Sequence, residues 1–528
     1  MEDQSAWTCS SNDAVQVSIV QPKGDGKLST LSTFYPEFTY SIFGDSETIF
    51  GYTGLMIQLR FAAHDLRSNV CISYDEKFKT VKDVSAVDLN KILKPFLPEE
   101  SFIPLKKFEE SLTKDKSAKD FKPPGEIVHT YTKGDRNYEV WAGCLADPDV
   151  QELLERIQIF ASLFIEGGTP IEINDPEWTL ERWMVYFVYE KLPEPPTPDA
   201  SIYSFVGYGT TYKWYFYSPT SEKCKVSNGP FPYETVINLA ELPSRLRISQ
   251  FLILKPHQLS GHGTQLYQTI HRASLKDPTV YELTVEDPNE AFDSLRDTND
   301  YHLLQPVFKH HNVTINANPY PATQPGRAQH RLVPTSRLIP VETLRDIRTK
   351  YKIAPTQFAH LVEMYLLSLI PMSHRGSHNV NLPRLRILKS RAPDEHDRQY
   401  YWWRMLVKQR LFKRHRDMLI QIDQAERVQK LEETLHNVEE GYENLLKAFG
   451  MKATREPAES ATPVTDEQQI QEEESGARAE HAVVRERTKR RFVVMEDEDE
   501  DDGDDQGVSS EGGGEKDNTN PPSKKARV

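Results

Sequence analysis

The fold is decided by three consecutive stretches between Arg245 and Glu286: RLRISQFLIL (245–254), KPHQLSGHGT (255–264) and TVYELTVE (279–286). The first and third are short and rich in β-branched and aliphatic residues, which is typical of buried strands. Between them, apolar residues from His262 to Ala273 recur at helical spacing. A strand, a helix and a second strand in this order predict one right-handed βαβ crossover with two parallel strands.

The junction between the first strand and the helix is suited to binding an anion. Gly261 and Gly263 have no Cβ, so backbone amides there can approach a ligand closely. The N-terminus of the helix adds unpaired N–H groups and the positive end of the helix dipole, which together suit a pyrophosphate. The turn is not a dinucleotide fingerprint, because no third glycine follows at the required spacing, and it lacks the Gly-Lys-Ser/Thr of a P-loop.

The segments before this unit predict a mixed α/β region and further strands. Strands are expected at GLMIQLRFA (54–62), NVCISY (69–74), RWMVYFVYEK (182–191) and SIYSFVGYGTTYKWYFYS (201–218), with a hairpin that turns at residues 133–135 and a helix over residues 149–165. The many aromatic residues between 208 and 217 indicate a sheet that packs on helices. A stacking platform for RNA is the alternative, but Lys213 is the only cation there for phosphate contacts.

Beyond about residue 340 the pattern is helical. Helices are expected over residues 341–351 and 356–370, followed by a long helix with one apolar seam formed by Leu431, Leu435, Val438, Tyr442, Leu445 and Phe449. The seam is typical of a small helical bundle. A dimerising coiled coil is the alternative, although the seam covers fewer heptads than such a structure usually shows.

The last segment, residues 451–528, has a different composition. It carries 12 Lys and Arg against 21 Asp and Glu, includes EDEDEDD (496–502) and shows no apolar periodicity. Such a segment cannot bury enough apolar surface to offset its ordering entropy, so it is predicted to be disordered. Two basic clusters, residues 485–491 and 521–527, resemble nuclear import signals, with simple charge balance as the alternative.

Composition narrows the class of protein. The chain has 528 residues and a net charge of −15, and its four cysteines form no CxxC pair, which argues against a disulfide framework or a zinc ribbon. The N-terminus lacks a signal peptide pattern, and the most apolar stretch, residues 361–370, is too short to span a membrane. A soluble intracellular protein is expected, with basic partners rather than direct nucleic-acid or membrane binding.

A family resemblance rests on motifs that occur in the same order along the chain. Gln258-x-x-Gly261-x-Gly263 after the strand resembles the acetyl-coenzyme A signature of the general N-acetyltransferase (GNAT) superfamily. Further motifs are similar to the type B histone acetyltransferases: FGDSE (43–47) with GYTGL (51–55), FIE (164–166) before Trp178, VGY (206–208) before Tyr212, and EDP (286–288) before LRD (295–297). The resemblance is close from Phe34 to Tyr301 and loose to about Phe449.

The sequence patterns, together with the resemblance over the first 450 residues, predict an α+β fold with four parts. They are an N-terminal mixed α/β region (1–140), an acetyltransferase core with a mixed central sheet and the βαβ acetyl-CoA unit (141–305), a C-terminal helical bundle (306–450) and the acidic tail (451–528).

The resemblance also implies a role for each motif. Acetyl-CoA would be the co-substrate, with Glu286 and Asp287 as the catalytic carboxylates. The implied coenzyme contacts are Phe251, Leu252, Ile253, Gln258, Leu259, Ser260, Gly261, His262, Gly263, Thr264 and Asn289. The implied histone-tail contacts are Asp45, Ser46, Glu47, Glu166, Trp178, Tyr212, Lys213 and Trp214, with Ser46 standing where an acidic residue is common. A valine at Gly263 should weaken coenzyme binding and leave the fold intact.

Elementary chemistry is compatible with these roles and leaves alternatives open. An amine of pKa near ~10.4 must lose a proton before it attacks a thioester, so a carboxylate that accepts the proton is needed. From the residues alone, Glu286 and Asp287 could instead cap the helix that starts near Pro288. Asp45, Glu47 and Glu166 could be solvated surface acids, and Trp178 a core aromatic.

The oxyanion that develops on the thioester needs a hydrogen-bond donor, which a free backbone N–H near Leu252 could supply. No metal is expected, because His257, His262 and His271 have no HExxH motif or cysteine partner. Direct transfer is expected rather than a cysteine acetyl-enzyme, since no cysteine lies in the βαβ unit.

Three functions are therefore compared. The first is acetylation of lysines in free histone tails, above all histone H-four; the second is another GNAT amine or peptide acetyltransferase; the third is a non-catalytic histone chaperone. The resemblance further implies a WD-repeat histone-binding subunit as partner and a location in both nucleus and cytoplasm.

Overall fold

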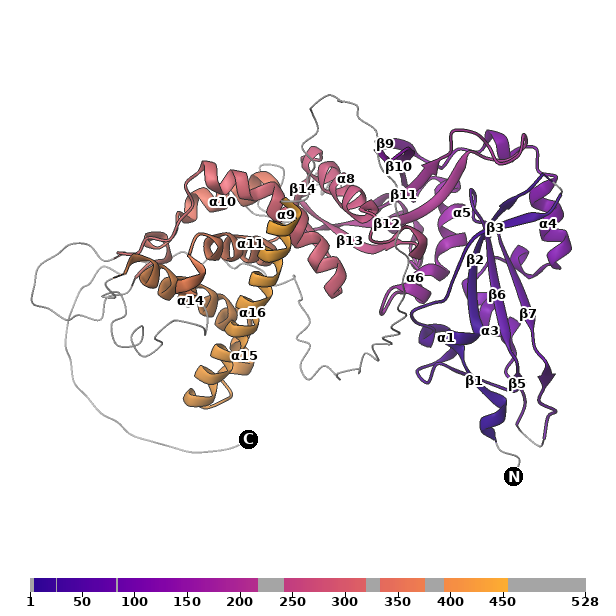
Figure 1. Ribbon diagram of the computed structural model, residues 1–528, viewed down its shortest axis with the longest axis horizontal. Coiled ribbons are helices and arrows are strands. Elements are labelled where there is room, and N and C mark those ends of the chain that lie inside the picture. Colours follow the sequence, from indigo (N-terminus) through magenta and orange to yellow (C-terminus); the bar gives the residue numbers. More distant parts are fainter. Residues whose placement is uncertain are drawn as a thin grey trace, which may run out of the picture. The chain divides into compact units, whose positions relative to one another are not determined.

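The computed structural model describes residues 4–24, 26–81, 84–216, 242–319, 333–375 and 394–453 (Figure 1). The predicted disordered tail, its two basic clusters and Cys224 lie outside these residues, apart from the start of the tail at residues 451–453.

A six-stranded sheet forms the centre of the described chain. Its strands are β9 (Glu126–Lys133), β10 (Arg136–Cys144), β11 (Trp183–Lys191), β12 (Tyr203–Tyr215), β13 (Ser244–Ile253) and β14 (Val280–Val285), and their order is β14-β13-β12-β11-β10-β9. Neighbouring strands are antiparallel except β13 and β14, which are parallel. The predicted hairpin is confirmed, because Lys133 faces Arg136 across a two-residue turn.

The helix α8 (His262–Lys276) joins β13 to β14, as the sequence predicts. Leu266, Tyr267 and Ile270 of α8 pack against Leu246 and Ile248 of β13 in one apolar cluster. The predicted α+β fold with a mixed central sheet is therefore confirmed.

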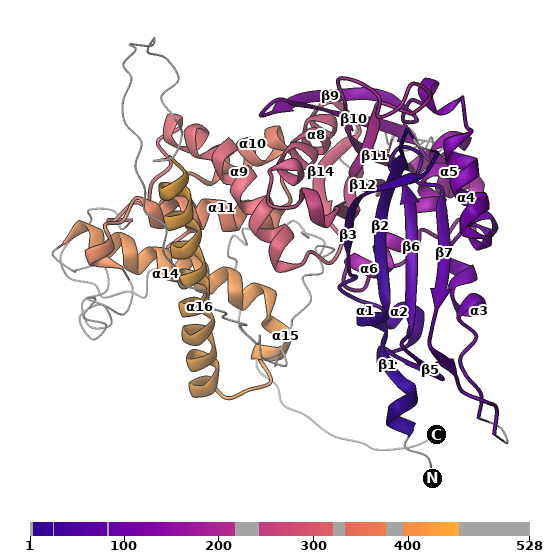
Figure 2. The same ribbon diagram turned by 45° about the vertical axis from the view of Figure 1, so that its right-hand side comes forward.

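A second, four-stranded sheet precedes the central one (Figure 2). It consists of β2 (Val15–Pro22), β3 (Leu28–Phe34), β6 (Met56–Ala62) and β7 (Ser68–Ser73) in the order β3-β2-β6-β7. Shorter elements flank it: β1 (Thr8–Ser10), α1 (Ser11–Ala14), α2 (Tyr40–Phe43), β4 (Thr48–Phe50), β5 (Tyr52–Thr53), β8 (Glu76–Lys77), α3 (Leu89–Leu93) and α4 (Leu105–Thr113).

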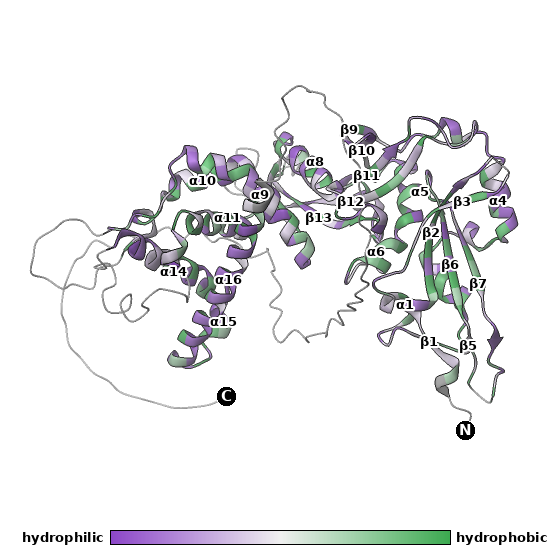
Figure 3. Ribbon diagram, viewed as in Figure 1, coloured by the Kyte–Doolittle hydropathy of each residue, from purple (hydrophilic) through white to green (hydrophobic). Residues whose placement is uncertain are grey.

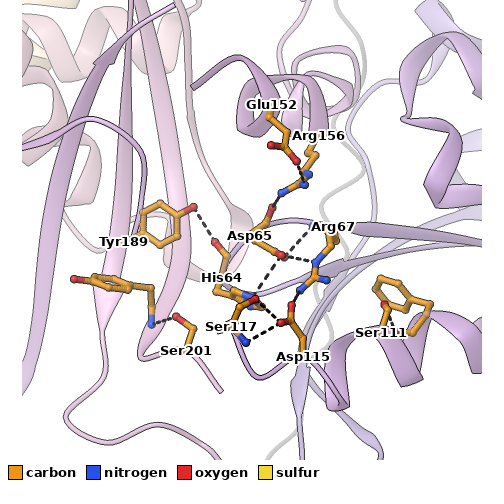
Figure 4. A network of polar contacts seen from close by, with 12 residues as sticks. His64, Asp65, Arg67, Ser111, Asp115, Ser117, Glu152, Arg156, Tyr189 and Ser201 are labelled. Carbon is orange, nitrogen blue, oxygen red and sulfur yellow. Dashed lines mark hydrogen bonds and ion pairs between the residues drawn. The ribbon is translucent and has the colours of Figure 1, made fainter. Parts of the chain in front are cut away.

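The turn between β6 and β7 ties the two sheets together. The Tyr189 hydroxyl of β11 donates to the His64 carbonyl at 2.9 Å, and the Phe205 amide of β12 donates to the Ala63 carbonyl at 2.7 Å. Figure 4 shows how Arg67 lies between Asp65 and Asp115, with which it forms ion pairs. These contacts satisfy the polar groups of a turn that is buried between the sheets.

One helix that the sequence predicts is divided in the structure. Residues 149–165 form α5 (Pro148–Ile157) and α6 (Ile159–Phe164). Gln158 between them keeps helical dihedral angles (φ −58°, ψ −29°), so the backbone passes from one helix to the other without an intervening loop. The Gln158 side chain accepts a hydrogen bond from the Ile171 amide. The short helix α7 (Pro176–Thr179) comes next.

The C-terminal region is a bundle of helices. It contains α9 (Glu290–His310), α10 (Val341–Tyr351), α11 (Pro355–Ser368), α14 (Glu395–Arg414), α15 (Arg416–Leu419) and α16 (Gln424–Ala453). Apolar and polar residues alternate along α16 (Figure 3). Its seam residues Leu435, Tyr442 and Phe449 are buried within this chain, with the Phe449 ring stacked 4.9 Å from that of Tyr301. The bundle predicted from the seam is thus observed.

The bundle also covers the outer edge of β14. The Leu283 amide donates to the Lys352 carbonyl at 2.8 Å, and the Arg348 guanidinium donates to the buried Glu282 carboxylate at 3.2 Å. The Lys352 ammonium donates to the carbonyls of Ser274 and Asp277 at 2.8 and 2.6 Å, at the C-terminus of α8. One lysine thereby joins β14, α8 and α10. Among the described residues, no helix is both long and apolar enough to cross a membrane.

Two carboxylates of α9, the buried Asp300 and the half-buried Asp297, link α8, α9 and α11. The Tyr267 hydroxyl donates to Asp300 at 2.9 Å, and the Gln357 side-chain Nε2 donates to Asp297 at 2.9 Å and to Asp300 at 3.1 Å. Burial raises the pKa of Asp297 from 3.8 to about 6, against the opposing effects of Gln357 and Arg296, and burial also raises the pKa of Asp300. Folding therefore favours the protonated form of Asp297.

This arrangement predicts a pH-dependent gain in stability for Asp297→Asn. Because the folded-state pKa lies above the unfolded value of 3.8, the cost of the charged carboxylate is absent below pH ~3.8 and complete above pH ~6. The variant should gain on the order of 2 kcal/mol in unfolding free energy at pH 8 and about a third of that gain at pH 4.5. Denaturant titration at both pH values measures this. The exposed Glu342→Gln should change stability by less than ~0.5 kcal/mol at either pH; equal gains for Asp297→Asn at both would contradict the interpretation.

Candidate active site

The two parallel strands of the central sheet separate near their C-terminal ends. Their pairing ends with Ile248 opposite Val285, and the final backbone bond runs from the Glu286 amide to the Ile248 carbonyl at 2.8 Å. Residues 249–253 of β13 continue along β12 only. A gap in the ladder therefore opens beside β13, where the crossover helix begins.

A β-bulge lies at the point of separation. Ser249 and Gln250 of β13 face the single residue Thr210 of β12, and the Gln250 amide donates to the Thr210 hydroxyl at 3.0 Å. In a bulge two successive side chains can point to the same face of the sheet. Here the Ser249 hydroxyl donates to Glu286 at 2.6 Å, and Gln250 accepts the Tyr208 hydroxyl at 3.0 Å.

The bulge leaves donors of β13 directed into the gap. The Leu254 amide donates to Val206 of β12 at 2.9 Å, and backbone groups alternate in direction along a strand. The amides of Phe251 and Ile253 therefore point away from β12, whereas that of Leu252, which faces Tyr208, points toward it. The free donors expected near Leu252 are those of its two neighbours.

The carboxylate of Glu286 stands at the mouth of this gap. One oxygen accepts the Tyr212 hydroxyl at 3.2 Å and the other accepts Ser249, while the side chain remains exposed. The Arg247 guanidinium donates to the Tyr212 hydroxyl at 3.3 Å. Burial raises the pKa of Tyr212, Arg247 opposes this, and Glu286 adds to it, so the phenol remains a donor at neutral pH. The Glu286 carboxylate is thus oriented by two hydrogen bonds and is accessible to solvent.

Aromatic rings and guanidinium groups form a wall beside Tyr212. The Arg182 guanidinium lies 4.8 Å from the Trp178 ring and 5.7 Å from that of Tyr212, and the Arg247 guanidinium lies 5.5 Å from that of Trp214. Trp178 and Trp214 are exposed. Side chains of this kind can pack against an extended peptide.

Lys213 points to the opposite face of the sheet from its two neighbours. Its ammonium pairs with Asp277 at 2.7 Å and donates to the Thr279 hydroxyl at 3.2 Å. Burial opposes ionisation of Asp277, but bonds from Lys213 and Thr279 lower its pKa to about 2. Tyr212 and Trp214 therefore lie on the face of the sheet that carries Glu286. Lys213 lies on the other face, where it pairs with Asp277 at the C-terminus of α8.

The glycine turn wraps the start of α8. Gly261 has a left-handed conformation (φ +82°) at the N-cap and provides no side-chain cap, so the first amides of α8 lack the usual partner. Leu259 is also left-handed (φ +55°) and fully exposed. The Gln258 side-chain Nε2 donates to the Ile253 carbonyl at 2.9 Å, and the Ser260 hydroxyl donates to the Gln258 carbonyl at 3.2 Å. Thr264 follows in the first turn of the helix.

A Cβ at Gly263 would meet other side chains rather than open space. It would lie 2.8 Å from Leu295 Cδ1 and 3.7 Å from the ring of Phe251. A valine there would force Leu295 to move, because this glycine permits close packing of α8 on β13 and α9. That the substitution weakens coenzyme binding and leaves the fold intact stays a prediction, with a cost in packing added to it.

The residues after Glu286 do not form the predicted helix cap. Asp287 is exposed and left-handed (φ +40°), and the cap of α9 is Asn289, whose side chain accepts the Phe292 amide at 2.9 Å. The capping alternative for Glu286 and Asp287 is thus not observed. The N-cap role also occupies Asn289, the implied coenzyme contact.

The acidic residues of the N-terminal region lie on a loop joined to that of Glu166. Asp45 and Ser46 are exposed, whereas the Glu47 carboxylate accepts the Thr39 amide at 2.9 Å. The Gly167 amide beside Glu166 donates to the Tyr40 hydroxyl at 2.5 Å. The same loop reaches β13, because Gln250 donates to the Thr169 carbonyl at 2.7 Å. No hydrogen bond or ion pair among the described residues joins these acids to Glu286.

The histidines considered for a metal have other partners. His262 Nδ1 lies 2.8 Å from the Tyr131 hydroxyl, and His271 Nε2 lies 2.9 Å from the Tyr351 carbonyl. Elsewhere in the described residues, His374 lies near Asp394 and Asp397. Asp394 there caps α14, so the group is explained by helix capping and an ion pair.

Comparison with known proteins decides the family. Residues 7–166 match the family described as "Histone acetyl transferase HAT1 N-terminus". Proteins named "Histone acetyltransferase type B catalytic subunit" are 59% identical in Aspergillus oryzae, over 92% of each chain, and 39% identical in Neurospora crassa, over 84% of this chain and 89% of that one. The chain belongs to this family. It is therefore an acetyltransferase.

A weaker likeness is to a solved aminoglycoside acetyltransferase from a soil metagenomic sample. It has 14% identity, a TM-score of 0.18 and covers 37% of this chain and 96% of that one, so it carries no argument about this family member.

Arg182, Arg247 and Ser249 are site residues that sequence reasoning missed. A signal existed for Ser249, because the alternation of RLRI breaks at the polar pair Ser249-Gln250 within an otherwise apolar strand. The arginines carried no such signal, since an arginine in a strand is most often solvated.

The packing of Gly263 predicts coupling with Leu295. Gly263→Val should lower the unfolding free energy by about 1–3 kcal/mol, because overpacking forces Leu295 to move. In a double-mutant cycle measured by denaturant titration, Gly263→Val should cost at least ~1 kcal/mol less in the Leu295→Ala background than in the wild-type protein. Gly441→Val in α16, where an added Cβ meets nothing within 4 Å, is the control without a steric partner. Strictly additive effects of the first two substitutions would refute the packing role.

Proposed function

We propose that this family member transfers the acetyl group of acetyl-CoA to lysine side chains in the tails of free histones, above all histone H-four. The observation that carries the proposal is the exposed Glu286 carboxylate, held by Tyr212 and Ser249 beside the free edge of β13. A proton acceptor and backbone donors at one gap are what attack of an amine on a thioester requires.

The described residues fit the coenzyme. The amides of Phe251 and Ile253 offer donors along the free edge, where the pantetheine arm would lie. The uncapped amides at the start of α8, beside a glycine without a Cβ, would hold the pyrophosphate. When bound, acetyl-CoA supplies the activated acyl group.

Glu286 would remove the proton from the acceptor amine, directly or through a water molecule. A protonated lysine has no free electron pair, so the proton must leave before the new amide bond forms. Tyr212 and Ser249 hold both carboxylate oxygens and so orient the group. The free amides of β13 would donate to the oxygen of the reacting carbonyl and stabilise its developing charge.

The acceptor peptide would lie along the aromatic wall. Trp178, Tyr212 and Trp214 would pack on it, and the loops with Glu166 and Asp45 would supply negative charge for a basic tail. Lys213 is not proposed as a contact of the peptide, because its ammonium pairs with Asp277 on the opposite face of the sheet.

The test of this function is incubation of the purified protein with acetyl-CoA and each core histone separately, followed by mass mapping of acetylated residues. Acetylation of lysine side chains in the free H-four tail is the expected result. Acetylation confined to small amines or to peptide N-termini would support another acetyltransferase activity. Histone binding without any transfer would support a chaperone instead.

Two further proposals concern the setting of the enzyme. A WD-repeat histone-binding subunit is proposed as a partner, and nucleus and cytoplasm as its locations. Both are implied by the resemblance, and the basic clusters of the tail add support for the nucleus. Truncation after Gly450 should leave turnover on a histone peptide within about twofold, because the active-site residues all precede Gly450. The truncation should also shift a fluorescent fusion toward the cytoplasm, because it removes both basic clusters. A large loss of turnover would contradict this.

Replacing the base should slow the chemical step and spare coenzyme binding. Glu286→Gln keeps the size of the side chain but removes the proton acceptor, so kcat should fall by roughly 10²–10⁴-fold. Calorimetric affinity for acetyl-CoA should stay within about threefold, and the acidic limb of the pH–rate profile should flatten.

The matched control is Asp287→Asn, the adjacent exposed carboxylate, which forms no hydrogen bond or ion pair among the described residues. It should retain most of the turnover. If Glu286→Gln keeps near-normal kcat while Asp287→Asn, Glu166→Gln or Glu47→Gln loses it, the base is the residue whose substitution removes the acidic limb.

A further inference from the structure

One face of β9 is directed at the first turn of α8. His129 Nε2 lies 2.9 Å from Gln265 Oε1, and the Tyr131 hydroxyl lies 2.8 Å from His262 Nδ1. Side chains two residues apart in a strand share a face. Lys133, the last residue of β9, therefore also projects toward the start of α8.

The Lys133 ammonium lies directly beside the glycine turn. A Cβ placed on Gly261 would be 3.0 Å from Lys133 Nζ. Within the described ranges, no carboxylate forms an ion pair with this lysine, whereas Arg136 at the other side of the same hairpin turn is paired with Glu190 at 3.4 Å. Lys133 is thus an exposed cation without a counter-charge beside the positive end of a helix dipole, where a bound anion would interact favourably with both.

The groups around this point are neutral or positive. Burial, His257 and Lys133 together lower the pKa of His262 to about 4, and burial and Arg136 lower that of His257. Burial raises the pKa of Tyr131, so its hydroxyl stays protonated. The surroundings of Lys133 therefore contain donors and a positive charge but no competing anion among these residues.

We propose that Lys133 binds the pyrophosphate of the coenzyme from the side of the β9–β10 hairpin, opposite the amides of α8. This rests on the proposed function, which places acetyl-CoA at the same turn. The hairpin would then form the outer wall of the phosphate site, and His129 and Tyr131 would position it through Gln265 and His262. A point charge facing backbone donors clamps a phosphate from two directions.

The experiment measures binding of coenzyme A and of 3′-dephospho-coenzyme A by calorimetry to the full-length protein. Lys133→Met should weaken both ligands by about 10-fold, since a charge-assisted bond to a phosphate is lost, and it should reduce the salt dependence of binding. Lys133→Arg should restore most of the affinity. Asp135→Asn, in the same hairpin turn, is the matched control with the opposite charge change and should not weaken binding.

The outcomes separate this proposal from the function on which it rests. Unchanged affinity of Lys133→Met for both ligands overturns the role of Lys133 and leaves the acetyltransferase assignment in place. A loss seen with coenzyme A but not with the dephospho form would assign Lys133 to the 3′-phosphate and overturn the pyrophosphate contact. Absence of coenzyme binding by the wild-type protein would instead overturn the proposed use of acetyl-CoA. Unchanged thermal unfolding of the variants shows that the fold is retained.

Discussion

The separation of β13 from β14 is the constraint on which the site depends. The last bond of their ladder, from the Glu286 amide to the Ile248 carbonyl, is followed by a bulge on β13, so the next strand residues lose one neighbour. Unpaired backbone donors are costly in a protein interior and persist where a ligand can satisfy them. The same geometry places the Glu286 carboxylate, the free amides and the start of α8 around one opening.

Different parts of the chain hold the two strands apart. β14 is bound along its outer edge by the helical bundle, through Lys352 and Arg348, and Lys352 also caps the end of α8. β13 is held by the loop after α6, through Gln250, and by the Gln258 side chain, which donates to the Ile253 carbonyl. The gap is therefore set by tertiary contacts, which explains how regions outside the βαβ unit contribute to an active site that lies within it.

The sequence predicted the crossover and its strands well, because periodicity and composition are local signals. The α10 helix and the hairpin at Gly134 were predicted for the same reason. The family motifs identified Glu286 and the glycine turn. The bulge and the packing of Gly263 on Leu295 could not be predicted, since each depends on a contact between residues distant in sequence. The approach of Lys133 to Gly261, 128 positions apart in the numbering, is of the same kind. The cap role of Asn289, which accepts from an amide three residues later, and the alternation that turns Lys213 away from Tyr212 are local signals that our sequence-based prediction did not use.

Amide hydrogen exchange at single-residue resolution, with and without acetyl-CoA, tests the central claim most directly. If the gap holds the coenzyme, the amides of Phe251 and Ile253 should exchange quickly in the free protein and become protected on binding. Those of Leu252 and Leu254, which face β12, should be protected in both states. Protection of all four amides without ligand, or no change at Phe251 and Ile253 when acetyl-CoA is bound, would contradict the account.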